Sequence, residues 1–382
     1  MIKGFRFCSS AALLIAFIAT TAIAQEAASL PPDLVKKIEE AIAGEQARLK
    51  IPALSVAIAT GGQLRYSRGF GMADLENSVP AKSTTLYRTA SIAKPITATA
   101  LMQLAEQGKI DLDAPIQKYC PAFPEKPWQV TARQLLGHLA GIRHYKTPVE
   151  AVGTNHYFTI GDSLNIFKDE PLLHEPGTKY NYTTYGFSVL GCAIEGVSGK
   201  SYADYLGEHI FKPSGMQRTR IDHHFILAAD RASGYQRLSQ GTYDQLPSSL
   251  KAQVAPGAIV NASMHDTSMK IPGGGLLSTP GDLVNFVLAL HGGKLVKKET
   301  LDQMWTSQKT KDGKETGYGM GWEVRQEGPI KLVSHSGGQA GASCLLTYSP
   351  DNRIVIAIMT NLQGAGLDAL AKGIADAILA KK

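Results

Sequence analysis

Cysteine pairs at metal-binding spacing, blocks of like charge and long apolar runs are scarce in this chain of 382 residues. The four cysteines form no Cys-x-x-Cys or other zinc spacing, so we expect neither a metal site nor a cofactor. Lys and Arg number 39 against 33 Asp and Glu, and no basic block concentrates the net charge of +6. Neither nucleic acid nor an anionic membrane surface is therefore indicated as a partner. No pattern indicates an oligomeric state.

The N-terminus has the pattern of a secretory signal peptide. Lys3 and Arg6 precede an almost wholly apolar stretch at residues 11–23, and Ala22-Ile23-Ala24 has the small-x-small form of a cleavage site. The stretch is too short for a stable membrane span, and no later run approaches 18 apolar residues. We expect cleavage after Ala24 and a periplasmic or secreted protein with no membrane span. The alternative is an uncleaved anchor.

The remaining cysteines leave the disulfide pattern open. Cys8 would leave with the signal peptide, and the other three cannot all pair. One disulfide with one free thiol is an alternative, but Cys192 and Cys344 lie in apolar runs, where buried, inert thiols are common.

Strand patterns gather at the two ends of the chain and helical patterns in its middle. Residues 53–60 and 63–69 flank a Gly-Gly turn typical of a hairpin, and a helix should begin close to Ser91. The C-terminal part alternates expected strands and helices: strands at 331–334, 343–348 and 354–359, and helices at 282–291 and 367–379. We expect one domain over residues 25–382. Its α/β part, about 25–95 and 266–382, would carry one sheet built from both chain ends, and a mostly helical insertion would span about 96–265.

Residues 91–94 carry the pattern Ser-x-x-Lys. Positions i and i+3 share a helix face, so Lys94 would lie beside Ser91 and, when desolvated, would help to remove its proton. Ser91 is therefore a candidate nucleophile, with a helix N-cap as the alternative. Residues 248–251 match the same pattern, but they lie in a polar loop rather than at the start of an apolar helix.

Two further segments carry residues that suit acyl transfer. Tyr182 lies in a turn ahead of an apolar helix, where it would shuttle a proton if a nearby lysine depressed its pKa; the alternative is a packed aromatic. His335-Ser336-Gly337-Gly338 ends an expected strand, where glycines let a substrate backbone approach and one N–H would complete an oxyanion hole with that of Ser91. His291-Gly292-Gly293 has the same form, but it is typical of a glycine-capped helix end.

The order and context of these three sites resemble the serine β-lactamase and penicillin-binding family, in the class C branch that includes esterases and peptidases. The resemblance runs from about Ile51 to the C-terminus and includes the stretches at residues 69–74, 135–142 and 274–282. Residues 141–145 and the Tyr-Thr-Thr at 182–184 are similar to a mitochondrial branch regarded as peptidases. The resemblance implies an α/β fold of the β-lactamase/transpeptidase type, with an antiparallel sheet flanked by helices.

The resemblance also implies roles for individual residues. Ser91 would be the acylated nucleophile, Lys94 its activating partner and Tyr182 the proton relay. His335, Gly337 and Gly338 would line the substrate strand, with Gly338 giving the second oxyanion N–H. His335 stands where a lysine is usual, and Thr184 stands where Tyr-x-Asn has its asparagine, so efficient β-lactam turnover is disfavoured. We expect an exported serine hydrolase acting on a small-molecule or peptide substrate with an amide or ester bond.

Two rival interpretations remain open. Gly161-Asp162-Ser163-Leu164 resembles the signature of flavodoxin-like esterases, but the Asp-x-x-His block of that family is absent, and a cap of a helix at 164–168 by Asp162 or Ser163 is favoured. Ser163-Leu164-Asn165 also mimics the Ser-x-Asn motif of other penicillin-interacting enzymes. The other rival is a peptidoglycan- or ligand-binding module that keeps the fold without turnover, which the Tyr-Thr-Thr departure favours slightly.

Overall fold

The computed structural model describes residues 29–380. The expected signal peptide at residues 1–24 and its cleavage site lie outside the described residues. Among residues 29–380, no helix has both the length and the apolar character needed to cross a membrane.

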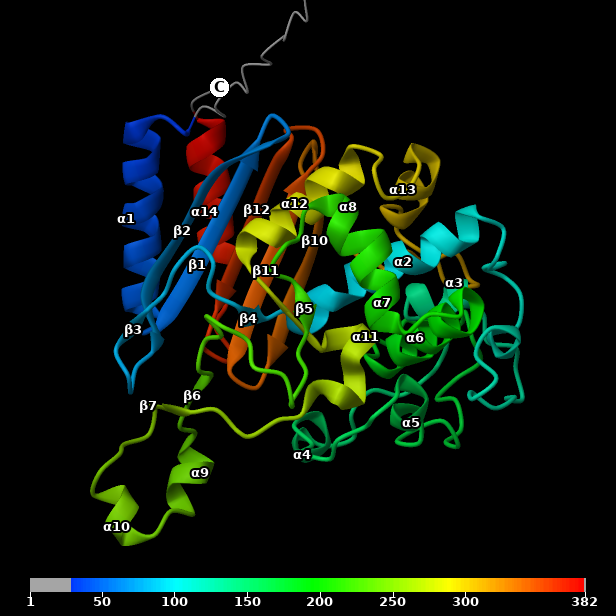
Figure 1. The fold of residues 1–382 in the computed structure, drawn as a ribbon, viewed down its shortest axis with the longest axis horizontal. Helices are drawn as coiled ribbons and strands as arrows, with labels where there is room; N and C mark the ends of the chain where they lie inside the picture. Colours follow the sequence, from blue (N-terminus) through cyan, green and yellow to red (C-terminus); the bar gives the residue numbers. More distant parts are fainter. Residues whose placement is uncertain (1–28, 381–382) are drawn as a thin grey trace, which may run out of the picture.

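One antiparallel sheet joins the two ends of the chain (Figure 1). Strand β1 pairs with β12 at the centre of the sheet, where Val56 lies opposite Ile358. This confirms the expected origin of the sheet in both ends of the chain. In spatial order the strands are β3 (Val79–Pro80), β2 (Gln63–Asp74), β1 (Ala53–Thr60), β12 (Ile354–Thr360), β11 (Ala342–Ser349), β10 (Ile330–Gln339) and β9 (Glu323–Glu327).

The central strands read as unbroken apolar runs because helices cover both faces of the sheet. Alternate residues of β1 enter two separate cores. Leu54, Val56 and Ile58 pack with the helices α1 (Pro32–Arg48) and α14 (Asp368–Leu379), which stand side by side against one face (Figure 1). The small residues Ala53, Ala57 and Ala59 face the opposite side, against α12 (Pro280–His291). Small side chains there let the helix approach the sheet closely.

Helix α1 was missed by the sequence analysis. It begins after Pro31 and buries Leu34, Ile38 and Ile42, one residue per turn. This single narrow row is weaker than the broad apolar face usual in a surface helix.

Helices and loops form the other half of the molecule. In the sequence, they lie between strand β3 and strand β9. The longest are α2 (Ala93–Glu106), which follows the short 3-10 helix η1 (Ala90–Ile92), and α6 (Tyr185–Ser198). The shorter helices are α3 (Ala132–Leu136), α4 (Pro148–Ala151), α5 (Ile160–Leu164), α7 (Tyr202–Leu206), α8 (Lys212–Ser214), α9 (Gln240–Asp244), α10 (Ser248–Lys251), α11 (Ile271–Gly274) and α13 (Lys298–Met304), with the 3-10 helices η2 (Ile116–Lys118) and η4 (Thr267–Lys270) and the π-helix η3 (Gly207–Phe211).

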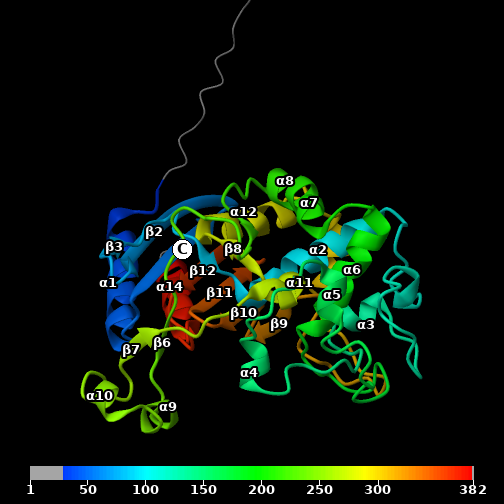
Figure 2. The ribbon, with the colours of Figure 1, turned by 60° about the horizontal axis from the view of Figure 1, so that its bottom comes forward.

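Short strands interrupt this helical region. Strand β8 (Leu276–Ser278) lies between β4 (Tyr87–Arg88) and β5 (Arg220–Ile221). Strands β6 (Tyr235–Arg237) and β7 (Ile259–Asn261) pair at the base of an arm that carries α9 and α10 away from the body (Figures 1 and 2). Strand β4 leads directly into η1, so it fixes where the segment with Ser91 begins.

The expectation of a buried, inert thiol is correct for one cysteine and wrong for the other. Cys120 and Cys192 form a disulfide, whereas Cys344 is free and buried. The apolar run around Cys192 belongs to α6, whose partly buried side presents the sulfur to the loop that carries Cys120. An apolar neighbourhood alone therefore did not distinguish a crosslinked cysteine from a free one.

Candidate active site

Ser91 lies in the middle of η1, one turn before α2. Ala90, directly before it, has a φ of +46°, a conformation that costs free energy for a residue with a side chain. Pro95 is accommodated because it stands in the first turn of α2, as expected. A helix start leaves its first N–H groups without helical partners, so the Ser91 backbone is suited to receive an anion.

Lys94 is brought directly to Ser91. Its Nζ lies 3.0 Å from Ser91 Oγ, 3.2 Å from Thr184 Oγ1 and 2.8 Å from the carbonyl oxygen of Gly273. Within residues 29–380 no carboxylate pairs with this fully buried amine. Burial first, and the positive charge of Lys270 second, lower the pKa of Lys94 well below its ordinary value. In its neutral form, an amine at this distance is able to act as a base toward a hydroxyl.

Tyr182 also contacts Ser91, but its pKa is not shifted in the direction that a proton shuttle was expected to need. Its ring lies 4.8 Å from Lys94 Nζ, and its hydroxyl is hydrogen bonded with Ser91. Burial raises the pKa of Tyr182, and the hydrogen bond with Ser91 opposes this only in part. The condition set for a proton shuttle, a pKa depressed by the nearby lysine, is therefore not met, because burial of Tyr182 itself dominates. Tyr182 is a hydroxyl donor in this environment.

Thr184 contacts Lys94 although it replaces the asparagine of the Tyr-x-Asn motif. Its hydroxyl contacts Lys94 Nζ, as noted above, and its backbone N–H donates to His144 Nδ1 at 3.2 Å. A hydroxyl does not offer the paired donor and acceptor of a carboxamide, so Thr184 supports Lys94 with one group only.

The edge of β10 beside Ser91 is open. Pairing of β10 with β9 ends at Ser334, so residues 335–339 have no strand on that side. Ser336 and Gly338 are exposed there, while Gly337 is buried against the segment that carries the nucleophile. A Cβ at Gly337 would lie 2.5 Å from both the Thr89 carbonyl oxygen and Cys344 Sγ. Glycine is required at this position for the strand to lie against η1.

His335 is buried and uncharged. Its Nδ1 lies 2.7 Å from the Ser336 carbonyl oxygen, to which it donates, and its Nε2 lies 2.8 Å from Tyr318 Oη, from which it accepts. Burial, followed by the charge of Lys94, lowers the pKa of His335 to about 3. It therefore offers a substrate no fixed positive charge at neutral pH.

The sequence analysis missed several residues that surround these groups. Tyr318 and His138 pack against Tyr182, with ring centroids 6.3 and 4.3 Å away. Tyr145 is hydrogen bonded to Thr184. The only signal for Tyr318 was its place between two glycines, and His138 and Tyr145 stood in segments noted only for their resemblance.

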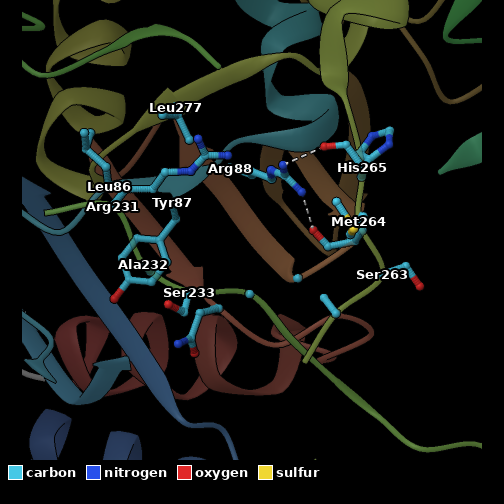
Figure 3. Close-up of a pocket in the computed structure, with 15 residues that line it drawn as sticks. Leu86, Tyr87, Arg88, Arg231, Ala232, Ser233, Ser263, Met264, His265 and Leu277 are labelled. Atoms are coloured by element: carbon cyan, nitrogen blue, oxygen red, sulfur yellow. Dashed lines mark hydrogen bonds between the residues drawn. The ribbon is translucent and has the colours of Figure 1, made fainter. Parts of the chain in front are cut away.

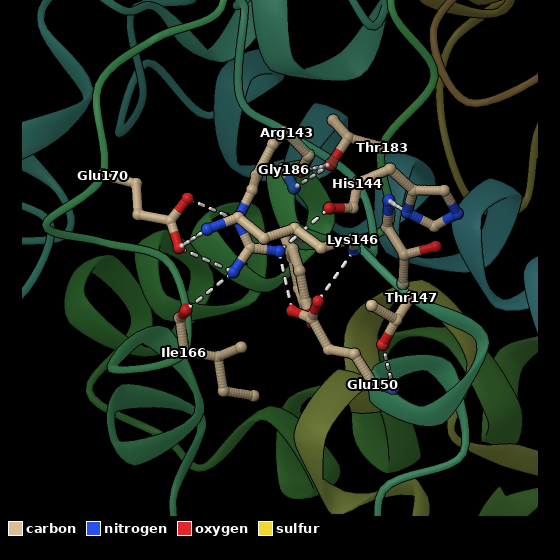
Figure 4. A network of polar contacts seen from close by, with 11 residues as sticks. Arg143, His144, Lys146, Thr147, Glu150, Ile166, Glu170, Thr183 and Gly186 are labelled. Atoms are coloured by element: carbon tan, nitrogen blue, oxygen red, sulfur yellow. Dashed lines mark hydrogen bonds and ion pairs between the residues drawn. The ribbon is translucent and has the colours of Figure 1, made fainter.

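An ion-pair network centred on Arg143 lies next to Thr183, between Tyr182 and Thr184 in the sequence (Figure 4). Arg143 binds Glu150 at 2.6 Å and Glu170 at 2.7 and 2.9 Å. Its carbonyl oxygen accepts from Thr183 Oγ1 at 2.6 Å. The network therefore fixes the backbone that presents Tyr182 and Thr184.

The rival motifs lie away from this arrangement. Ser163 is buried and donates to the carbonyl oxygen of Ile160. Its helix has Thr159 as the N-cap, and Asp162 completes the capping box by accepting from the Thr159 N–H, so the expected cap is correct in part for Asp162 and wrong for Ser163. Ser248 begins the short exposed helix α10. His291 ends α12 with Gly292 as its C-cap, as predicted.

A polar cavity of about 330 Å³ lies beside the segment that leads to Ser91 (Figure 3). Arg88 lines it and donates to the carbonyl oxygens of Ala340 and His265, at 3.1 and 3.0 Å. These bonds tie the turn after β10 to the strand that precedes Ser91.

Comparison with known proteins identifies the family. The profile described as Beta-lactamase matches residues 38–381. The chain belongs to the beta-lactamase family. This is a family of serine hydrolases, and the fold is that of β-lactamases and transpeptidases.

Individual relatives extend this family assignment. The chain is 29% identical to the serine beta-lactamase-like protein LACTB, mitochondrial, of Homo sapiens, over 90% of this chain and 78% of that protein. It is 30% identical to a penicillin-binding protein of Bacillus subtilis, over 80% of this chain and 67% of the other. The D-amino acid amidase of Ochrobactrum anthropi shares its fold, with a TM-score of 0.78 and 24% identity over 92% of this chain and all of that one (100%).

Proposed function

We propose that this protein is an exported serine hydrolase that cleaves an amide or ester bond through an acyl-enzyme on Ser91. The observation that carries the proposal is the fully buried, unpaired Lys94 amine 3.0 Å from Ser91 Oγ. Neutral amines in such a position act as general bases.

In the first step Ser91 Oγ attacks the substrate carbonyl carbon while its proton passes to Lys94. The resulting oxyanion is bound by the N–H groups of Ser91 and Gly338. Tyr182 gives its hydroxyl proton to the leaving amine or alcohol as that bond breaks, and recovers a proton from the Lys94 ammonium. Water then attacks the acyl-enzyme with Lys94 as the base, and Ser91 is released with its proton restored.

Export rests on two separate observations. The N-terminal pattern at residues 1–24 is that of a cleavable signal peptide. The disulfide between Cys120 and Cys192 is typical of an oxidising compartment, such as the periplasm or the medium.

Covalent labelling of Ser91 tests the proposal directly. The mature protein is incubated with a fluorophosphonate probe and the adduct is located by peptide mapping, with Ser91→Ala as the matched control. We expect an adduct on Ser91 that is absent from the variant. An adduct on Ser163 would reassign the nucleophile. No adduct on the folded protein would favour the non-catalytic binding module.

A further inference from the structure

A second buried lysine, Lys270, lies near the nucleophile. It ends the 3-10 helix η4, directly before α11, and is only 5% exposed. A methyl group added at Gly274 would lie 3.6 Å from both Lys270 Cδ and the carbonyl carbon of Ala90. Gly274 therefore lies between the aliphatic part of the Lys270 side chain and the backbone that leads into Ser91.

The amine of Lys270 has few partners. Its Nζ lies 3.5 Å from the Ala151 carbonyl oxygen and 5.4 Å from the centre of the Tyr145 ring. No carboxylate of residues 29–380 pairs with it, because Asp222, the nearby acid, is bound by Arg88 and Arg231 at 2.8 and 2.7 Å. A buried ammonium without a counter-charge is costly, so this amine is set up to receive an anion.

Contacts connect Lys270 to the reacting groups. Thr184 contacts Lys94 Nζ at 3.2 Å, and it is hydrogen bonded to Tyr145, whose ring faces Lys270. Tyr182, the proposed proton donor to the leaving group, packs against His138 and His335. It also packs against His144, whose ring contacts Tyr145. Lys270 is therefore linked to the reacting groups through Tyr145 and Thr184.

We propose that Lys270 is a specificity-determining residue that binds a carboxylate on the acyl portion of the substrate. This inference rests on the proposed function and names its substrate class: amides or esters of acids that carry a second, anionic group. His335 is neutral where a lysine is usual, whereas Lys270 brings a protonatable amine close to the backbone that leads into Ser91. Burial lowers the pKa of Lys270 to about 7, and a bound carboxylate would raise it again.

Matched ester pairs test the inference. The p-nitrophenyl monoesters of adipic and pimelic acid are each compared with the p-nitrophenyl ester of the corresponding monoamide, which has the same shape without the charge. We expect the wild-type protein to prefer the carboxylate by about tenfold or more in kcat/KM, chiefly through KM. Lys270→Met should abolish this preference, so that the carboxylate and monoamide esters are turned over with equal kcat/KM. Lys270→Arg should keep part of it.

The controls separate this inference from the proposed function. Lys251→Met removes one charge from the exposed helix α10 and should keep the preference. Turnover of the monoamide esters that is lost in Ser91→Ala establishes the hydrolase independently of Lys270.

Three outcomes would overturn the role of Lys270. One is a wild-type protein without preference, which decides the matter even if the variants fail to fold. Another is an equal loss on both esters in Lys270→Met, which would assign the lysine to the proton chemistry of Lys94. The third is an unchanged preference in that variant. If no ester is turned over and no probe labels Ser91, both proposals fall.

Discussion

The hydroxyl of Tyr318 donates to Nε2 of His335 across 2.8 Å, while Nδ1 of the same ring donates to the backbone. In the neutral form of His335, both ring nitrogens therefore have a hydrogen-bond partner. A proton on Nε2 would face the Tyr318 hydroxyl hydrogen in a buried environment, so the folded protein disfavours the imidazolium.

This arrangement makes the free energy of unfolding depend on pH. A histidine whose pKa is lower in the folded than in the unfolded protein stabilises the fold above the unfolded pKa of about 6.5, and this stability is lost as pH falls from there toward the folded value of about 3. We expect His335→Gln to flatten the acid limb of urea-unfolding stability between pH 7 and 4, by on the order of 3 kcal/mol. An unchanged acid limb in the variant would contradict a neutral His335.

Lys94 should increase activity at the expense of stability. Lys94→Met replaces a buried unpaired amine by an apolar side chain of similar length, so we expect kcat/KM to fall by about 10²–10⁴ while the melting temperature stays equal or rises. Ester hydrolysis and calorimetry measure the two quantities. A variant that melts well below the wild type would show that Lys94 is required mainly by the fold.

The pH profile of turnover should follow Lys94 rather than a histidine. Protonation removes the base, so kcat/KM should fall as pH falls through the pKa of Lys94, which burial holds well below 10.5. His335→Gln should leave the position of this acid limb in place. Loss of the limb in that variant would move the general base to His335.

Gly337 should tolerate no side chain. The Cβ of Gly337→Ala would meet the Thr89 carbonyl oxygen and push β10 away from η1, so we expect kcat to fall by about 10²–10³ through loss of the oxyanion donors. Gly44→Ala, whose added methyl meets nothing within 4 Å in α1, is the matched control and should keep full activity. Normal turnover by Gly337→Ala would place the oxyanion site elsewhere.

The disulfide should stabilise the helical region. Cys120 and Cys192 are 72 residues apart, so we expect Cys192→Ala to lower the free energy of unfolding by about 2–4 kcal/mol. Dithiothreitol should lower the melting temperature of the wild type and leave that of the variant unchanged. Equal sensitivity of both proteins to the reductant would show that the crosslink is not formed.

Local sequence patterns predicted those parts of the site in which the residues are close together in the sequence. Ser91 and Lys94 share one helical turn, and residues 335–338 share one strand, so their spacing indicated which of them lie close together, and the family resemblance supplied their roles. Lys270, Tyr318 and Arg143 were not predicted as site residues, because their roles depend on which distant segments face them. The direction of the Tyr182 pKa shift was not available from the sequence for the same reason: burial is a property of the whole fold.

The pairing of β1 with β12 also determines when the chain can fold. The backbone N–H of Ala53 donates to the side chain of Asn361, which lies 308 positions later. The centre of the sheet therefore cannot close until the last strand has been synthesised, and a ribosome-bound chain holds an open strand edge until then. A C-terminal truncation that removes β12 would split the sheet through its middle instead of trimming its margin.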